Sequence, residues 1–171
     1  MRMSTEKLKA ELIAAGSETK ARELSRFFKT GQGEYGEGDK FIGVTVPVNR
    51  AITRRYLHLR APQLVDLLRS EIHEVRLSAL ICMVEQYKSR HTSDSQRQEI
   101  VNTYIANTCY INNWDLVDLS VYNIIGAHLL HHDRELLYRW ADSELMWEQR
   151  MAIVATMWFI RHGEYDDTIR L

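Results

Sequence analysis

The chain can run as helix over most of its length, because proline, the residue that most effectively stops a helix, occurs only twice. Pro47 and Pro62 each stand where a helix could begin, a position that tolerates the missing N–H. Strand-like alternation is nearly absent, and its single candidate, residues 40–46, is too short to pair with anything. The sequence therefore predicts an all-α fold, with helices over residues 4–15, 18–29, 47–58, 62–69, 73–89, 94–109, 114–130, 133–141 and 144–162.

The composition is that of a soluble globular protein. With 45% hydrophobic and 26% charged residues, the 171-residue chain can form one domain with a real core. It has no apolar run long enough to cross a membrane, and its first residues lack the apolar core of a secretion signal. We therefore expect a cytoplasmic monomer without membrane contact. Cys82 and Cys109 lie in apolar helical runs without CxxC spacing and are predicted to be buried thiols.

Positive charge is concentrated in one stretch, although the net charge is only −1. The segment NRAITRRYLHLR carries Arg50, Arg54, Arg55 and Arg60 and no acidic residue. This pattern indicates either a positive surface on a neutral protein or an ordinary solvated helix face.

A glycine-rich segment, GQGEYGEG at residues 31–38, is predicted to be a long loop between early helices. It lacks the GK[ST] ending of a phosphate-binding loop and no strand precedes it, so a nucleotide site is not expected there. We interpret it as a mobile or substrate-covering loop that carries Tyr35.

Several helices resemble one another. The segments HEVRLSAL at 73–80 and WEQRMAIV at 147–154 share Glu-x-Arg and lie 74 positions apart, with WDLVDLSV at 114–121 near the midpoint. A helix pair recurring at roughly 37 residues is typical of a HEAT-type solenoid. The chain is therefore predicted to form a single HEAT-like-repeat domain, an α-α superhelix over residues 1–171.

Asp118 is the residue that most needs an explanation. It lies four residues after Trp114, so both project from one helix face, and its other neighbours on that face are apolar. A carboxylate in such a place requires a partner or a cavity, because burying it alone is costly. Asp115, by contrast, suits the start of a helix that Asn112 or Asn113 caps.

A second pair could meet Asp118. Trp147 and Arg150 are three residues apart near the start of the equivalent helix later in the chain. If the repeats superpose, Trp114, Asp118 and Arg150 face one concave surface, which Tyr122 could extend. An ion pair between repeats, with tryptophans in the core, accounts for the same pattern, and Arg76 beside Glu74 is predicted to be structural in this way.

Other chemistry has less support. His128, His131 and His132 have the spacing of metal ligands on one helical face, but the helix is predicted to end there and no further ligand motif is visible. No Ser-His-Asp set and no cysteine nucleophile is indicated. We therefore expect neither a metal nor another cofactor.

Four segments together resemble the DNA alkylation repair family, the alkylpurine DNA glycosylases built from HEAT-like repeats. They are GDKFIGVTVPVNR, HEVRLSALICMVEQY, NNWDLVDLS and WEQRMAIVATMWFIRHG. The resemblance runs from about residue 20 to the end of the chain, and its most specific element is Trp-Asp-x-Val-Asp followed by Trp-x-x-Arg.

The resemblance implies an enzyme that removes N3- and N7-alkylated purines from duplex DNA. Trp114 and Asp118 match the family's catalytic residues, and Arg150 matches its DNA-contacting arginine. Tyr35 would correspond to a further aromatic residue near the lesion. The DNA-binding candidates are Arg150, Trp147, Tyr35, Arg50 and Arg54.

The resemblance also implies a difference. Family members are longer, and a further active-site tryptophan comes from a repeat that would follow Leu171, so we expect the C-terminal repeat or repeats to be missing. Trp158 stands too early to replace that tryptophan. Two hypotheses follow: a glycosylase in which Asp118 stabilises oxocarbenium character and orients water, or a non-catalytic module that binds damaged or branched DNA or a protein partner.

Overall fold

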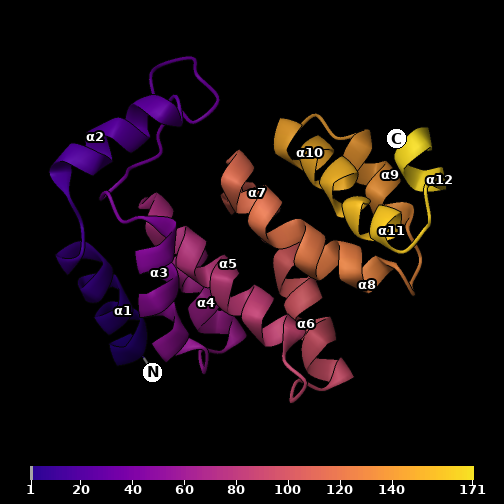
Figure 1. The fold of residues 1–171 in the computed structure, drawn as a ribbon, viewed down its shortest axis with the longest axis horizontal. Coiled ribbons are helices and arrows are strands. Elements are labelled where there is room, and N and C mark those ends of the chain that lie inside the picture. The colour runs from indigo at the N-terminus through magenta and orange to yellow at the C-terminus, as the bar shows by residue number, and fades with distance from the viewer. Residues whose placement is uncertain (1) are drawn as a thin grey trace. The chain divides into compact units, whose positions relative to one another are not determined.

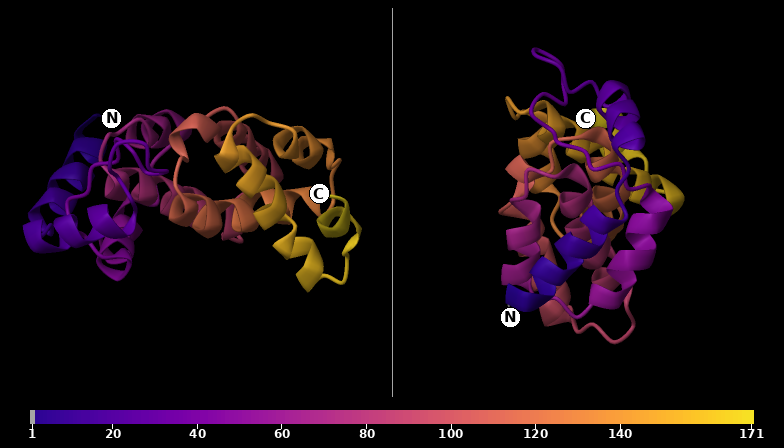
Figure 2. Two further views of the ribbon diagram at one scale, coloured as in Figure 1. Left: turned by 90° about the horizontal axis from the view of Figure 1, so that it is seen from above. Right: turned by 90° about the vertical axis from the view of Figure 1, so that its left-hand side faces the viewer.

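The computed structural model describes residues 2–171, and the described chain consists of helices joined by loops (Figures 1 and 2). It contains no strand within those residues, only an isolated bridge between Lys40 and Ile72. The all-α prediction is thus confirmed. The chain divides into two compact units, Met1–Glu85 and Gln86–Leu171. Among the described helices, none is long and apolar enough to span a membrane.

The first unit begins with two helices that precede the glycine-rich loop and continues with three that follow it. The helices are α1 (Arg2–Ala14), α2 (Glu18–Phe27), α3 (Val46–Thr53), α4 (Ala61–Leu68) and α5 (His73–Lys88), with α5 extending a few residues into the second unit. A 3₁₀ turn, Arg54–Tyr56, follows α3 where the sequence predicted uninterrupted helix. Pro47 and Pro62 lie in the first turns of α3 and α4, as expected.

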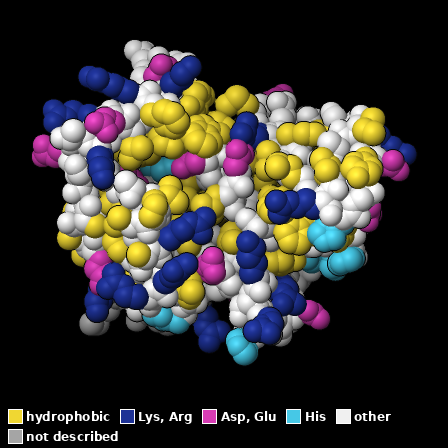
Figure 3. Space-filling model, in the orientation of Figure 1, with side chains coloured by type: hydrophobic (Ala, Val, Ile, Leu, Met, Phe, Trp, Pro, Cys, Tyr) yellow, Lys and Arg dark blue, Asp and Glu magenta, His cyan; other side chains and the backbone are white. Residues whose placement is uncertain are grey.

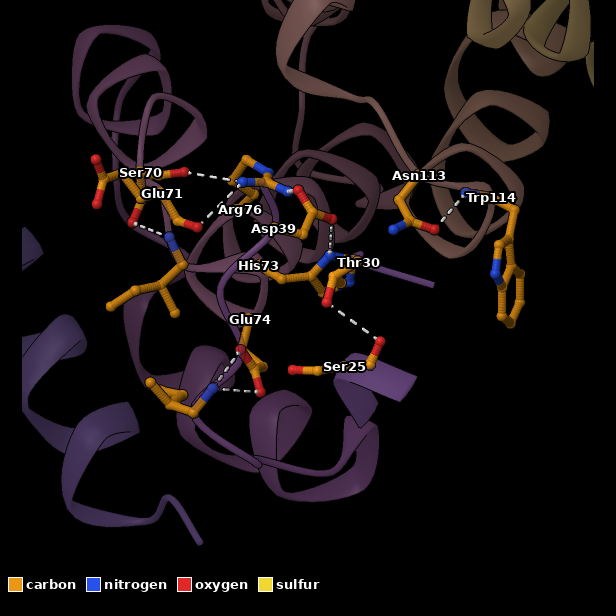
Figure 4. Close-up of polar contacts among 12 residues, drawn as sticks. Ser25, Thr30, Asp39, Ser70, Glu71, His73, Glu74, Arg76, Asn113 and Trp114 are labelled. Atoms are coloured by element: carbon orange, nitrogen blue, oxygen red, sulfur yellow. Dashed lines mark hydrogen bonds and ion pairs between the residues drawn. The ribbon is translucent and has the colours of Figure 1, made fainter. Parts of the chain in front are cut away.

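Helix α5 is enclosed on all sides over its first three turns, where every residue from His73 to Val84 is buried. The carboxylate of Glu74 anchors the loop before α3, because it accepts backbone N–H hydrogen bonds from Ile42, Gly43 and Val44 at 2.8–3.2 Å. Figure 4 shows this carboxylate beside the loop. Glu74 therefore has a structural role.

A buried ionic cluster lies at the same end of α5. Arg76 Nη2 donates to Asp39 Oδ1 at 2.6 Å, and His73 Nδ1 lies 3.1 Å from Asp39 Oδ2 (Figure 4). The imidazole also stacks on Phe41, with ring centres 4.4 Å apart. Arg76 is structural as predicted, although its partner is Asp39 rather than Glu74.

The second unit consists of shorter helices that pack against one another. They are α6 (Asp94–Ile105), the 3₁₀ turn Thr108–Tyr110, α7 (Trp114–Val121), the π-helical segment η3 (Tyr122–Gly126), α8 (Ala127–Leu129), α9 (Glu135–Ala141), α10 (Met146–Ala155), α11 (Met157–Arg161) and α12 (Asp166–Arg170). Helix α10 packs against both α7 and α9, and α11 packs against η3.

The helix predicted over residues 114–130 is interrupted by a π-helical segment. At its end Gly126 lies so close to the next helices that a Cβ there would be 2.4 Å from the carbonyl oxygen of Ala155 and 3.0 Å from Trp158 Cβ. Tertiary packing therefore sets the geometry of this segment, and the local sequence did not indicate it.

The prediction that both thiols are buried is correct for Cys82 and wrong for Cys109. Helix α6 ends at Ile105, so Cys109 lies in the 3₁₀ turn that follows rather than on a packed helix face. Burial raises the pKa of Cys82 to about 12.

The last helix, α12, has five residues and is tied to the rest of its unit by one arginine. Arg134 Nη1 donates to Asp167 Oδ2 at 2.6 Å, Nη2 donates to Glu164, and the guanidinium lies 4.1 Å from the ring centre of Phe159. These contacts compensate for a helix too short to be stable alone.

Candidate functional site

Three of the residues singled out in the sequence lie one helical turn apart on the same side of α7 and η3. Trp114, Asp118 and Tyr122 follow one another at intervals of four residues, and all three are half-buried. Residues at this spacing are neighbours on a helix surface. Asn113 caps α7, since its side-chain oxygen accepts the Trp114 N–H at 2.8 Å (Figure 4).

Asp118 is paired with Arg150 of α10 through two hydrogen bonds. Arg150 Nε donates to Oδ1 at 2.8 Å and Nη2 donates to Oδ2 at 2.7 Å. The Asp118 side chain is 38% exposed and the Arg150 side chain is 41% exposed, so the pair lies at the surface rather than in the core. The hydrogen bonds to Asp118 raise the pKa of Arg150. The sequence thus correctly placed Arg150 beside Asp118.

Contacts behind and beside the pair hold the two helices in place. The Glu148 carboxylate accepts from Thr108 Oγ1 and from Ser143 Oγ, each at 2.7 Å, which joins the turn before α7 to the loop before α10. On the opposite side of α7, the buried Ser120 hydroxyl donates to the Leu116 carbonyl and lies 2.8 Å from the Tyr104 hydroxyl. Ser120 is therefore a packing residue.

Trp147 lies in the first turn of α10 and is half-buried, three residues before Arg150. The second unit thus contains four of the seven predicted site residues, and it brings Asp118 and Arg150 into direct contact.

The other three predicted site residues, Tyr35, Arg50 and Arg54, belong to the first unit. Tyr35 is 36% exposed, and its hydroxyl donates to the Phe27 carbonyl at 3.4 Å. Lys29 Nζ lies 6.0 Å from the centre of the Tyr35 ring.

In the arginine-rich stretch, some arginines lie beside acidic residues and others do not. Arg50 lies 4.0 Å from Glu85, and Arg55 is paired with Glu11 at 2.6 Å. Arg54 is exposed and makes no ion pair with any described residue. Figure 3 shows Lys and Arg side chains interspersed with Asp and Glu rather than forming a surface of one sign.

The three histidines near the end of α8 do not form a metal-binding group. His128 and His132 stack with ring centres 3.9 Å apart, and His132 Nδ1 lies 2.7 Å from the His128 carbonyl oxygen. Burial, and to a lesser extent the nearby His132, lower the pKa of His128. Residues 2–171 contain no group of three or more potential ligands that could hold a metal ion.

One group beside the site was not singled out from the sequence. Trp158 and Arg161 lie next to Tyr122, and neither was predicted to be a site residue. A signal for it exists, because WFIR at 158–161 repeats the Trp-x-x-Arg spacing of WEQR at 147–150 eleven residues later.

The chain matches the family model described as DNA alkylation repair enzyme over residues 8–171. No curated protein and no solved structure gives a match to it.

Proposed function

The chain belongs to the DNA alkylation repair family, and we propose that it is a glycosylase acting on cationic N3- and N7-alkylated purines in duplex DNA. It would hydrolyse the N-glycosidic bond without a cofactor, as a cytoplasmic monomer. The observation that carries this proposal is the placement of Asp118, a half-exposed carboxylate that two hydrogen bonds hold in one orientation beside Trp114 and Tyr122.

The chemistry of the substrate explains why one carboxylate would suffice. Alkylation at N7 or N3 gives the purine a positive charge, so it leaves without being protonated by a general acid. Breaking the bond then develops positive charge on the deoxyribose. Asp118 would stabilise that charge and orient a water molecule toward C1′. At about 4 Å and an effective dielectric constant of about 20, the attraction is roughly 4 kcal/mol, an upper bound worth about three decades in rate.

Arg150 limits this attraction, because a guanidinium joined to the carboxylate largely cancels its charge. In the described chain Arg150 Nη1 makes no hydrogen bond, whereas Nε and Nη2 both donate to Asp118. Arg150 could therefore hold a DNA phosphate through Nη1 while it keeps the carboxylate in position. The phosphate would then offset part of the arginine's charge and leave more of the Asp118 charge available to the sugar.

The tryptophans would contribute through their ring faces. Trp114, one turn before Asp118, could attract the cationic sugar or base with about 0.5–2 kcal/mol. Trp147 would line the DNA path beside Arg150. In the first unit Tyr35, Arg50 and Arg54 are proposed DNA contacts. The packing of α10 against both α7 and α9 supports a HEAT-like arrangement of helix pairs.

A non-catalytic role is the alternative, and one observation favours it. The two hydrogen bonds between Asp118 and Arg150 are also what we would expect of a purely structural ion pair that holds α7 against α10. In that case the chain would be a module that binds damaged or branched DNA, or a protein partner, and Asp118 would have no reaction to assist.

Single-turnover release of 7-methylguanine from duplex DNA tests the proposal. We expect Asp118→Asn to lower the rate by two or more decades while thermal unfolding and DNA binding are retained. Asp142→Asn removes an exposed carboxylate at the end of α9 and should leave the rate unchanged. Equal release by the native chain and Asp118→Asn, or no release by either, would contradict the proposed role of Asp118.

A further inference from the structure

A second arginine lies one helical turn along from the Asp118 pair. Arg161 Nη1 donates to the Tyr122 hydroxyl at 2.6 Å, and its Cζ lies 5.4 Å from the centre of the Tyr122 ring. Tyr122 follows Asp118 by four residues on the same helix face, and Arg161 follows Arg150 by eleven residues, on α11 rather than on α10. The segment formed by α7 and η3 therefore makes two successive arginine contacts, the first from Asp118 to Arg150 of α10 and the second from Tyr122 to Arg161 of α11.

The second contact differs from the first in its charge. Arg150 is neutralised by a carboxylate, whereas Arg161 is exposed, is bonded to a neutral hydroxyl, and has no acidic group of the described residues within 4.0 Å. A guanidinium has five N–H donors in a fixed plane. Since only Nη1 makes a hydrogen bond within the described chain, Arg161 keeps both its charge and most of its donors for a ligand.

The Tyr122 ring that contacts Arg161 is the first of three adjacent rings. The Tyr122 and Trp158 ring centres are 5.0 Å apart, and Trp158 stacks on His162 with ring centres 5.2 Å apart. Tyr122 and Trp158 are half-buried, so each ring combines a packed side with a side that solvent reaches. Guanidinium donors beside exposed aromatic faces are the combination that single nucleotides engage, through phosphate and through stacking.

The fold supports this arrangement without a ligand. The close approach of Gly126 to the Ala155 carbonyl brings η3 against the start of α11, which places Tyr122 beside Trp158. His162 Nδ1 donates to the Trp158 carbonyl at 2.7 Å, because a carbonyl oxygen can only accept. The rings are therefore fixed by packing and by hydrogen bonds before any DNA binds.

We propose that Arg161, held by Tyr122 and flanked by Trp158, binds a backbone phosphate of the DNA strand whose alkylated nucleotide faces Asp118. The inference rests on the proposed function, since it takes DNA as the ligand. The site suits a phosphodiester rather than a base edge, because a charged guanidinium that solvent reaches can contact the backbone of any DNA sequence.

The test is the salt dependence of binding to an undamaged duplex, measured by fluorescence anisotropy. Loss of one phosphate contact reduces the slope of log K against log salt by about 0.9. We expect Arg161→Gln to show this reduction and to bind about five- to ten-fold more weakly at about 0.1 M salt. Arg161→Lys keeps the charge and should retain the native slope. Arg139→Gln, which removes an exposed arginine on α9, should also retain it.

Tyr122→Phe tests the hydrogen bond that positions Arg161 separately from the charge of Arg161. It removes the hydroxyl that accepts from Arg161 and keeps the ring, so it should weaken binding with little change in slope. A native slope in Arg161→Gln would overturn the proposal, whatever the excision rate. If the native chain binds no duplex at all, the phosphate site and the proposed function both fail. If it binds but does not excise, the proposed glycosylase function fails and the phosphate site at Arg161 can still hold.

Discussion

Asp39 and Arg76 form an ion pair from which water is almost wholly excluded. Arg76 Nη2 lies 2.6 Å from Asp39 Oδ1, and the two side chains are 6% and 2% exposed. Arg76 also donates to the Ser70 carbonyl at 3.0 Å, so the pair joins the loop before α3 to the start of α5. Two charges removed from water depend on each other, because removing either one takes from the other its closest opposite charge.

Breaking this pair should destabilise the protein strongly. We expect Arg76→Met to lower the free energy of unfolding by about 3–5 kcal/mol, since it removes the guanidinium that pairs with the buried Asp39 carboxylate. Urea unfolding followed by circular dichroism measures the change. Arg139→Gln, at an exposed position, should stay within about 0.5 kcal/mol of the native value. A loss below about 1 kcal/mol in Arg76→Met would show that the cluster is not structurally important.

Replacing Arg150 should affect activity far more than stability. The Asp118–Arg150 pair is roughly two-fifths exposed, and such pairs contribute about 0–1 kcal/mol. We therefore expect Arg150→Ala to unfold at nearly the native urea concentration, to bind duplex DNA more weakly and to release 7-methylguanine more slowly. A loss of about 3 kcal/mol or more would instead identify Arg150 as part of a structural ion pair and favour the non-catalytic module.

Gly126→Ala should disturb the second unit. The added Cβ would lie 2.4 Å from the carbonyl oxygen of Ala155 at the end of α10 and 3.0 Å from Trp158 Cβ of α11, so η3 must move away from both helices, at a cost of about 1–3 kcal/mol. Because this also separates Tyr122 from Trp158, tryptophan fluorescence should change together with the melting temperature. Ala127→Gly, the opposite change at the next residue, should cost about 0.5–1 kcal/mol through helix propensity alone and should leave the fluorescence unchanged.

The attachment of α12 should weaken in acid. Burial alone would raise the pKa of Asp167, but hydrogen bonds from Tyr138 and Arg134 outweigh it and lower the pKa. A carboxyl group with a lowered folded-state pKa stabilises the fold above its unfolded-state value, about 3.9, and loses that contribution as the pH falls through the folded value.

The measurement compares the melting temperatures of the native chain and Asp167→Asn from about pH 6 to about pH 2. The native chain should be more stable at the higher pH, and the difference should vanish at the acid end. Asp166→Asn, in the same turn but exposed, should follow the native curve throughout. If the melting temperatures of the native chain and of Asp167→Asn differed by the same amount at every pH, the stabilising role of the Asp167 carboxylate would be contradicted.

Most helices were predicted close to where they lie, because their apolar spacing, prolines and caps are local properties of the sequence. Asp118 and Trp114 could be placed on one face for the same reason. The predicted helix 144–162 is divided between α10 and α11, however, and α12 was not in the predicted list. The contact with Arg150 was expected only on the additional assumption that repeats superpose, and the structure shows the contact itself.

The features that could not be predicted depend on tertiary contacts. The π-helical segment exists where Gly126 meets Ala155, residues that are far apart in sequence. Cys109 is exposed because α6 ends four residues earlier, in a stretch whose composition would equally suit a continuing helix. Arg161 became a candidate only through its bond to Tyr122. The catalytic and DNA-binding roles of the site residues remain predictions.

The pairing of Asp118 with Arg150 also determines which cations the site attracts from solution. A lone surface carboxylate attracts magnesium ions and polyamines. The Asp118 carboxylate is instead joined to a guanidinium by two hydrogen bonds, so the two groups form a short dipole. The field of this dipole decays well within the Debye length of about 8 Å. Free alkylated nucleosides, although cationic, would find little attraction there. Only a ligand that brings its own phosphate to Arg150 would change this balance, so the same contact that orients Asp118 would also favour damaged DNA and nucleotides over free nucleosides.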